Sequence, residues 1–317
     1  MLCIDPTHSA DPSSRSFADG FFAPIPDALA GAVHARSCPE LSDRDWLRLG
    51  VRRALEAFPS GRAFLQHLAA AGEEPPELSH FFETLKSARR LDLVREVAVA
   101  VAASLPPLPG DAWAHVPELE KFDLFAGDGH FHAAAAHDPR IAKDGGGEGG
   151  SKDAVGHFFA LDLRSHALVH LTAADQVARR KEHDMRVLKR LDLEMLRQGA
   201  RKGRKVLYVW DRAGIDFRQW HHWKHTGGVY FLSREKENMA LEVVGENRWD
   251  RADPRNAGVL GDELVSTSQG VSVRRVRYRC PLRGEVFHFL TTECTLPPGV
   301  IAHLYRLRWE IEPSGAR

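Results

Sequence analysis

Hydrophobic residues recur at helical spacing in the N-terminal third of the chain. Apolar positions four residues apart from Leu47 to Leu55 follow a capping-box pattern at residues 42–45 (Ser-Asp-Arg-Asp). A second helical pattern takes Ser79 as its cap and continues through the apolar run 91–101. This part of the chain is therefore predicted to be helical.

The C-terminal segment has the same kind of periodicity. Pro297 and Pro298 precede it, and proline is favoured in the first turn of a helix. Apolar residues then follow at four-three-four spacing, which predicts a helix with one buried stripe. The stripe consists of Val300, Leu304, Leu307 and Ile311.

Three polar side chains are expected beside that stripe. Tyr305, Arg308 and Glu312 share a face at roughly 100° of rotation per residue, so one helix offers a phenol, a guanidinium and a carboxylate to the same space. Arg308 and Glu312 are also i,i+4 neighbours. A surface ion pair is the alternative interpretation, and for such a spacing taken alone it is the commoner outcome.

The middle of the chain has the pattern of strands. Short apolar or alternating runs bounded by glycine and polar residues predict five of them, at residues 122–131, 157–163, 167–171, 206–211 and 228–234. A long helix is expected at about 176–200, with Met185, Leu188, Leu191 and Met195 on its inner face, and a further helix through Trp220 and Trp223. Strand, strand, strand, helix, strand, helix is the element order of an RNase-H-like α/β core.

Residues from about 240 to 292 have a β-like pattern with imperfect alternation. Strands are expected at 241–244, 272–279 and 285–290. We interpret this stretch as a β-strand insertion between the fifth strand and the closing helix.

Composition divides the chain into four parts. Residues 1–24 are rich in Ser, Asp and Pro and are expected to be a mobile leader. Residues 25–110 form a helical region that ends in a proline-rich linker. The α/β domain with its β insertion takes residues 111–312, and residues 313–317 are an aberrant tail.

Charge and hydropathy restrict the location and the partners. Lys plus Arg equals Asp plus Glu, 43 each, so a nucleic-acid partner requires local basic patches. No apolar run approaches the roughly 18 residues of a membrane helix. The first residues also lack the features of an export signal. We expect a cytoplasmic protein with no membrane partner.

Cysteine and histidine spacing does not predict a structural metal site. The four cysteines lie far apart and form no C-x-x-C pair, so free thiols are expected. His130 with His132, and His221 with His222, lack further ligands at the spacing of a structural zinc site. We therefore expect neither a zinc site nor a disulfide framework.

A small basic cluster lies in the second helical pattern. Lys86, Arg89 and Arg90 could contact DNA phosphates. A solvated helix face explains the same residues equally well, and the two interpretations stay open.

Two aspartates stand at the ends of predicted strands. Asp128 lies near the end of the first strand and Asp211 at the tip of the fourth, and these two strands are neighbours in an RNase-H-like sheet. Magnesium-type ions prefer carboxylate oxygens, and phosphoryl transfer on DNA uses two such ions about 3.5–4 Å apart. A turn or helix-cap role is the alternative for each aspartate considered alone.

Taken together, these motifs resemble a known family. Tyr305-x2-Arg308-x3-Glu312 is similar to the first three members of the Tyr-Arg-Glu-Lys signature of bacterial insertion-sequence transposases, in the branch called the insertion sequence four family. Asp128 and Asp211 resemble the first and second acidic residues of a DDE transposase. The run 86–91 and the segment Tyr230-x3-Arg234-x-Lys236 resemble further family motifs, so the likeness covers about residues 80–312.

The resemblance implies an enzyme that cuts and joins DNA. Asp128, Asp211 and Glu312 would bind Mg²⁺, or Mn²⁺, and catalyse cleavage and strand transfer at insertion-sequence ends. DNA contacts would come from Tyr305, Arg308, Arg234, Lys236, Lys86, Arg89 and Arg90. The implied partners are double-stranded DNA, as terminal repeats and as target, and a second copy of the chain in a homodimer. Such a bacterial protein would associate with the nucleoid.

The chain departs from the family pattern after the glutamate. Pro313 follows Glu312 directly, and the family's lysine, about seven residues further on, would fall beyond Arg317. His130 also stands where a small hydroxylated residue is usual. We therefore expect a truncated transposase whose own activity is open. A non-catalytic or inhibitory DNA-binding fragment is the first alternative, and an RNase-H-like nuclease is the second.

Overall fold

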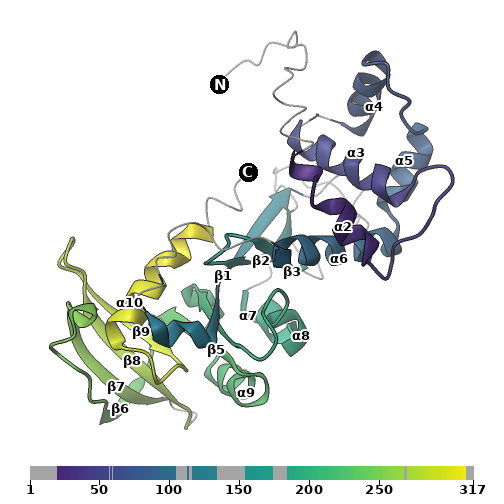
Figure 1. Cartoon of the computed structure of the whole chain (residues 1–317). Coiled ribbons are helices and arrows are strands. Elements are labelled where there is room, and N and C mark those ends of the chain that lie inside the picture. The colour runs from purple at the N-terminus through teal and green to yellow at the C-terminus, as the bar shows by residue number, and fades with distance from the viewer. Residues whose placement is uncertain are drawn as a thin grey trace, which may run out of the picture. The chain divides into compact units, whose positions relative to one another are not determined.

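The computed structural model describes residues 20–56, 58, 60–104, 113, 116–133, 154–173, 184–267 and 270–311 (Figure 1). It divides the chain into two compact units, Met1–Ser104 and Leu105–Arg317. The boundary falls at the edge of the predicted linker, whose own residues 105–110 lie outside the described ones, as do most of the predicted leader and the whole tail 313–317.

The N-terminal unit is helical, as predicted. Its described helices are α2 (Ile25–Ala30), α3 (Asp43–Leu55), α4 (Gly61–Ala70), α5 (Leu78–Leu85) and α6 (Ala88–Ser104). Ser42 caps α3 by accepting a hydrogen bond from the Asp45 backbone N–H at 3.1 Å, which confirms the predicted start.

The second helical pattern was wrong in two details. Ser79 lies inside α5, because the N-cap position is Glu77, which makes no side-chain cap. The pattern also continues as two helices, because the chain turns at residues 86–87 before α6 begins.

The C-terminal unit contains one sheet of nine strands among the described residues. They are β1 (Phe122–Ala133), β2 (Ala154–Asp162), β3 (Leu168–Ala173), β4 (Lys205–Trp210), β5 (Val229–Arg234), β6 (Leu241–Glu246), β7 (Val259–Thr267), β8 (Ser272–Arg279) and β9 (Val286–Thr291). Their order across the sheet is β3-β2-β1-β4-β5-β9-β8-β7-β6. The pairs β1–β4 and β4–β5 are parallel and the others antiparallel.

All eight strands expected from the sequence are present. Residues 241–291 extend the main sheet, because β9 pairs with β5 and carries β8, β7 and β6 onward. Strand β7 was missed. Its run Val-Leu-Gly-Asp-Glu-Leu-Val-Ser-Thr places two acidic residues in the middle, and both are buried.

Buried ion pairs explain those acidic residues. Arg274 on β8 donates to both carboxylate oxygens of Asp262 on β7, at 2.9 and 2.7 Å, and Arg275 donates to Glu263 at 2.9 and 2.6 Å. Because each carboxylate forms an ion pair with a guanidinium, the strands can bury these charges without leaving them unpaired.

The sheet has a hydrophobic core on each face. Core A joins Leu124, Ala126, Leu207 and Val209 of the sheet to Leu304 and Ile311 near the C-terminus. Core B joins Phe125, Tyr208, Trp210 and Phe231 to Leu188, Leu196, Trp220 and Trp223 from the helices that precede β4 and β5. Figure 1 shows α10 (Pro298–Arg306) and α9 (Phe217–Gly227) on opposite sides of β5.

The predicted long helix at 176–200 is wrong. The described part contains two short helices, α7 (Asp184–Arg190) and α8 (Leu193–Leu196), and residues 176–183 lie outside the described ones. Asp192 ends the continuity because its side chain caps α8, accepting from the Met195 N–H at 2.8 Å. Leu188 and Leu191 still point into core B, as their spacing predicts.

The closing helix is present but changes geometry. It is α-helical over Pro298–Arg306 and continues as a 3-10 helix, η4, over Leu307–Glu310. Val300, Leu304 and Ile311 are buried as predicted, and Leu307 is half-buried. The predicted apolar stripe is therefore confirmed, although its last turn is wound more tightly than an α-helix.

Candidate active site

Asp128 lies in β1 between two glycines whose small size has a structural cause. A Cβ atom on Gly127 would come within 2.1 Å of the Trp210 ring, and one on Gly129 within 2.5 Å of Phe158. Both aromatic rings belong to core B. Aromatic packing on one face of β1 thus requires the glycines, and the aspartate between them is directed to the opposite face.

Asp211 follows the last residue of β4, which is parallel to β1. The register pairs Gly127 with Trp210, so Asp128 and Asp211 are the next residues of the two chains. Neighbouring strands lie about 4.8 Å apart, so the backbone of Asp128, in the middle of β1 and not near its end as predicted, lies beside that of Asp211, just past the end of β4. The sequence prediction that these two acidic residues would meet agrees with this register.

Both carboxylates are oriented by backbone contacts. Asp128 Oδ1 accepts from the Gly129 N–H at 2.9 Å, and Asp211 Oδ1 accepts from the Ala213 N–H at 2.7 Å. The fully buried Ser233 hydroxyl on β5 donates to the Asp211 carbonyl at 2.9 Å and fixes the end of β4. The helix-cap alternative is thus correct in geometry for Asp211, which caps the short 3-10 helix Arg212–Gly214 (η2).

The face occupied by these carboxylates follows from strand alternation. Leu124 and Ala126 on β1 lie in core A, so Asp128, two positions further, faces the same way. Val209 lies in core A and Asp211 is in extended backbone two positions on. Both aspartates are half-buried beyond core A, on the face that α10 and η4 cover.

Tyr305 on α10 lies within electrostatic reach of this pair. Burial raises the pKa of the Tyr305 phenol, the charge of Arg308 lowers it, and the charge of Asp211 raises it further. Arg234 and Arg212 also act on the phenol and lower its pKa. The pKa of the Tyr305 phenol is therefore influenced by one site carboxylate and three guanidinium groups.

The predicted DNA-binding residues on this face are not equally exposed. Arg308 is 6% exposed, and its guanidinium lies 4.2 Å from the centroid of the exposed Trp309 ring. Arg234 at the end of β5 is half-buried, 4.6 Å above the Phe287 ring. Lys236 follows two residues later and is also half-buried. Arg308 thus acts from inside the fold, whereas Arg234 and Lys236 stand at its edge.

Glu312, the third predicted acidic residue, lies outside the described residues. The chain is described up to Ile311, which is buried in core A together with Ala126 and Val209. Among the described residues, no group of three metal-ligating side chains is present. The structure therefore brings two of the three predicted metal ligands together.

The matching family is found over this same part of the chain. Residues 125–316, more than half of the sequence, match the model of the transposase DDE domain. The chain belongs to the transposase DDE domain family. A search among curated proteins found no similar sequence.

Membership implies a transposase, which is a DNA-processing and DNA-binding enzyme. Asp128, Asp211, Glu312, Tyr305, Arg308 and Arg234 all fall inside the segment that matches the transposase domain, whereas the helical unit precedes it. No helix in the described part of this transposase combines the length and apolarity needed to cross a bilayer.

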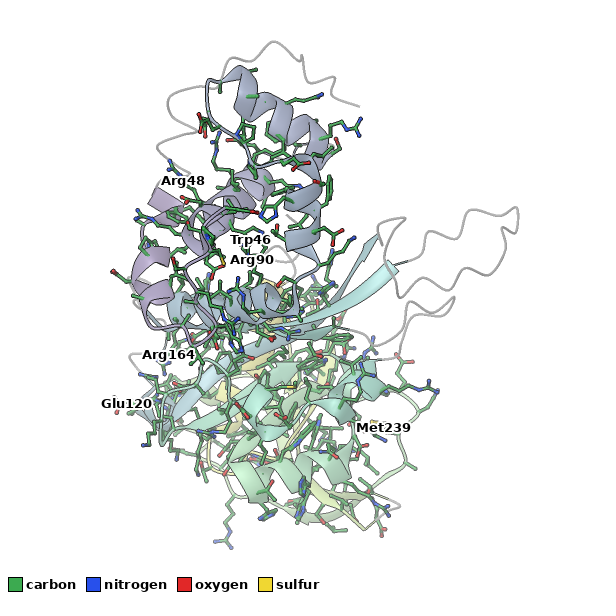
Figure 2. All side chains as sticks on the ribbon, turned by 90° about the vertical axis from the view of Figure 1, so that its right-hand side faces the viewer. Trp46, Arg48, Arg90, Glu120, Arg164 and Met239 are labelled. Carbon is green, nitrogen blue, oxygen red and sulfur yellow. The ribbon has the colours of Figure 1, made fainter. Side chains whose placement is uncertain are left out.

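In the helical unit, two of the three residues predicted to contact DNA serve the fold. Arg89 donates to both oxygens of Asp43 at 2.7 and 2.8 Å and to the His34 carbonyl at 2.7 Å. Arg90 is 4% exposed and donates to Asp43 and to the Leu41 carbonyl. Figure 2 shows Arg90 beside Trp46, whose ring centroid lies 5.1 Å from the guanidinium.

Lys86 differs from these arginines. It is exposed and forms only a surface ion pair with Glu83, at 2.7 Å, among the contacts described. Arg89 and Arg90 form ion pairs with Asp43, whereas Lys86 does not. Neither of the two predicted interpretations, a DNA contact or a solvated helix face, therefore describes all three residues. The DNA-binding interpretation stays a prediction for Lys86.

Two residues of the site were missed from the sequence. Arg212, next to Asp211, is exposed and influences the Tyr305 phenol. Its position directly after a strand-end aspartate was a usable signal. Ser233 had none, because a buried serine in an apolar strand is recognised only when its partner, the Asp211 carbonyl, is known.

Proposed function

We propose that this transposase cuts DNA at insertion-sequence ends and joins the freed ends to target DNA, using divalent ions held by Asp128, Asp211 and Glu312. The observation that carries the proposal is the register of β1 and β4, which places Asp128 and Asp211 at neighbouring positions of two parallel central strands, on the same face of the sheet. The strand order β3-β2-β1-β4-β5, with β2 antiparallel, supports an RNase-H-like core.

The donor set suits a hard cation. Magnesium and manganese prefer carboxylate oxygens and retain several waters, so a protein need supply only a few acidic groups on rigid elements. Asp128 and Asp211 meet this requirement because each is fixed by a backbone N–H through one oxygen. When bound, such ions supply Lewis-acid stabilisation of the phosphate and a more acidic water.

The cationic residues around the pair have separate roles in this proposal. Arg234 and Arg212, at the edge of the site, offer guanidinium donors that suit phosphate oxygens of bound DNA. Arg308 is buried, and its charge lowers the pKa of the Tyr305 phenol, on which Asp211 also acts. In the proposal this charge assists binding of phosphate without a direct surface contact.

The insertion sequence four branch is supported by the closing segment. Tyr305 lies in α10, which contacts β5, and Arg308 lies in η4, which contacts β1 and β4. A helix that carries the third acidic residue has to approach the strands that carry the other two. In the proposal, Glu312 completes the set immediately after Ile311.

Nicking of DNA tests the proposal. The full chain is incubated with a duplex that carries the terminal repeats flanking its gene, with Mg²⁺ or with EDTA. We expect single-strand cuts at the repeat ends with Mg²⁺ only, and no cuts by Asp128→Asn at any metal concentration.

The matched control is Asp162→Asn. Asp162 is a half-buried strand residue that, like Asp128, accepts backbone N–H bonds, here from Arg164 at 2.7 Å and Ser165 at 3.0 Å, but it pairs with Phe125 away from the site. This variant should cut like the wild type. Salt-sensitive DNA binding with no cleavage by the wild type would replace the enzyme proposal with a non-catalytic DNA-binding protein.

A further inference from the structure

Helix α9 carries a pair of histidines that the proposed DNA chemistry does not use. His221 and His225 are exposed and four residues apart, so they share one face of the helix. Their Nε2 atoms are 3.1 Å apart, and their ring centroids 4.2 Å. The helix packs on core B, on the other face of the sheet from Asp128 and Asp211.

The helix that presents this pair is firmly held. Asp216 caps its start by accepting from the Gln219 N–H at 3.1 Å, and Gly228 ends it in the left-handed region at φ 62°. Trp220 and Trp223 are buried in core B on the inner side. The two imidazoles therefore project from a rigid backbone, which lowers the ordering cost of binding a ligand between them.

The distance between the nitrogens fits a chelated metal ion. With zinc–nitrogen bonds of about 2.05 Å, two nitrogens 3.1 Å apart subtend about 98° at the metal. This angle lies between the right angle of octahedral geometry and the tetrahedral angle. The pair needs no large movement to hold an ion, and its exposure leaves the remaining coordination positions to water.

We propose that His221 and His225 form a surface site for a divalent transition-metal ion of the zinc, nickel or copper type. Imidazole nitrogen suits these ions, whereas carboxylates suit magnesium and manganese, so this site and the proposed carboxylate site select different metals. Both Nε2 atoms bind as neutral lone-pair donors with the proton on Nδ1. Because a metal ion competes with protons for these nitrogens, binding weakens as the pH is lowered.

From the sequence we expected no zinc site at His221 with His222. Consecutive helical residues project roughly 100° apart and cannot chelate one ion. The partner one turn later, His225, is the residue that the helix brings to His221. A hydrogen bond between two neutral imidazoles is the alternative explanation of the contact, and it requires no metal.

Metal titration of the full chain separates the two explanations. Nickel and zinc binding is measured by isothermal titration calorimetry at pH 7.5, with excess Mg²⁺ present to occupy carboxylate sites. We expect the wild type to bind one more ion per chain than H221A/H225A. A half-buried pair, His157 and His170, has nitrogens at a similar 3.1 Å, so the difference between variants is the quantity to compare.

His222→Ala is the control, because His222 is exposed on the same helix and contributes no ligand in the proposal. It should retain the full stoichiometry, and circular dichroism should show all variants folded. Equal stoichiometry and affinity in the wild type and H221A/H225A would overturn the proposal, as would loss of the site in His222→Ala. Neither result depends on whether the chain cuts DNA.

Discussion

Two aspartates at the start of helical turns, Asp43 in the helical unit and Asp211 in the sheet unit, are used in opposite ways. The Asp43 side chain is 3% exposed. It accepts hydrogen bonds from two guanidinium nitrogens of Arg89, from one of Arg90 and from the Arg36 backbone N–H. Asp211 is half-buried at the end of β4 and accepts a hydrogen bond from the Ala213 N–H. Asp128 occupies the neighbouring position on β1.

The difference shows what distinguishes a structural carboxylate from a ligand. Burial with cationic partners satisfies the oxygens of Asp43 and leaves no capacity for an ion. Placing two carboxylates at neighbouring positions of two central strands favours a cation between them, because like charges repel. The two regions therefore predict different responses to the same substitution.

The largest expected effect is on stability. Asp43→Ala leaves the buried Arg90 guanidinium without its carboxylate, and breaking a buried pair costs about 3–5 kcal/mol. Urea unfolding of the full chain measures this change. Asp92→Ala removes a surface pair with Arg95 and should cost only a few tenths of a kcal/mol. Similar losses in the two variants would contradict the structural role of Asp43.

The second effect is on the rate of DNA cleavage, without a matching loss of stability. Asp211→Asn keeps the hydrogen bond to the Ala213 N–H but removes a metal-ligating charge, so the cleavage rate should fall on the order of 10²–10³-fold, as when one transition-state stabilising group is removed. Unfolding should change little. The assay is nicking of terminal-repeat DNA with Mg²⁺, and an unchanged rate would show that Asp211 is only a helix cap.

The third effect is the pH dependence of stability. Burial raises the pKa of Asp43, but hydrogen bonds from Arg89 and the Arg36 N–H, with the charges of Arg89 and Arg90, hold it below its ordinary value of 3.8. When the pKa of a carboxyl group is lower in the folded state than in the unfolded state, its charge stabilises the fold at any pH above the unfolded-state pKa. This stability is lost as the pH falls toward the folded-state pKa. Unfolding free energy should therefore fall more steeply below about pH 4 in the wild type than in Asp43→Ala. Parallel curves would contradict this linkage.

The smallest effect is on the salt dependence of DNA binding, and it concerns the exposed residue Lys86. Lys86 is 71% exposed on its side chain, so Lys86→Ala should leave unfolding unchanged. If Lys86 contacts a phosphate, the slope of log affinity against log salt should fall by about 1. Arg95→Ala, another exposed residue of the same unit, should leave the slope unchanged. An unaltered slope in Lys86→Ala would remove this unit's last predicted DNA contact.

Much of the fold was predictable because strands in this protein are short apolar runs with clear ends. The β4 run Lys-Val-Leu-Tyr-Val-Trp is buried along almost its whole length. The failures have local causes. Asp192 falls inside the predicted helix 176–200, but its side chain caps α8 and divides that helix in two. Strand β7 was concealed because Asp262 and Glu263 are acidic, and only their partners on β8 make burial acceptable.

The candidate site was predictable to the extent that backbone register determines it. Strand ends and strand order sufficed to bring Asp128 and Asp211 together. Which arginines face solvent was not predictable, because the fate of Arg90 depends on Asp43, 47 residues away in the sequence. His225 does carry a signal in the sequence, because it stands four residues after His221, the spacing at which helical side chains share a face.

Metal-directed cleavage of the protein backbone tests the central claim most directly. Fe²⁺ replaces Mg²⁺ in H221A/H225A, which lacks the proposed histidine site, and ascorbate with peroxide then cuts the chain next to the bound ion. The account predicts cuts close to residues 128 and 211, suppressed by excess Mg²⁺ and absent when both aspartates are changed to asparagine. Cuts confined to other segments, or cuts that survive the double substitution, would show that these adjacent carboxylates hold no metal.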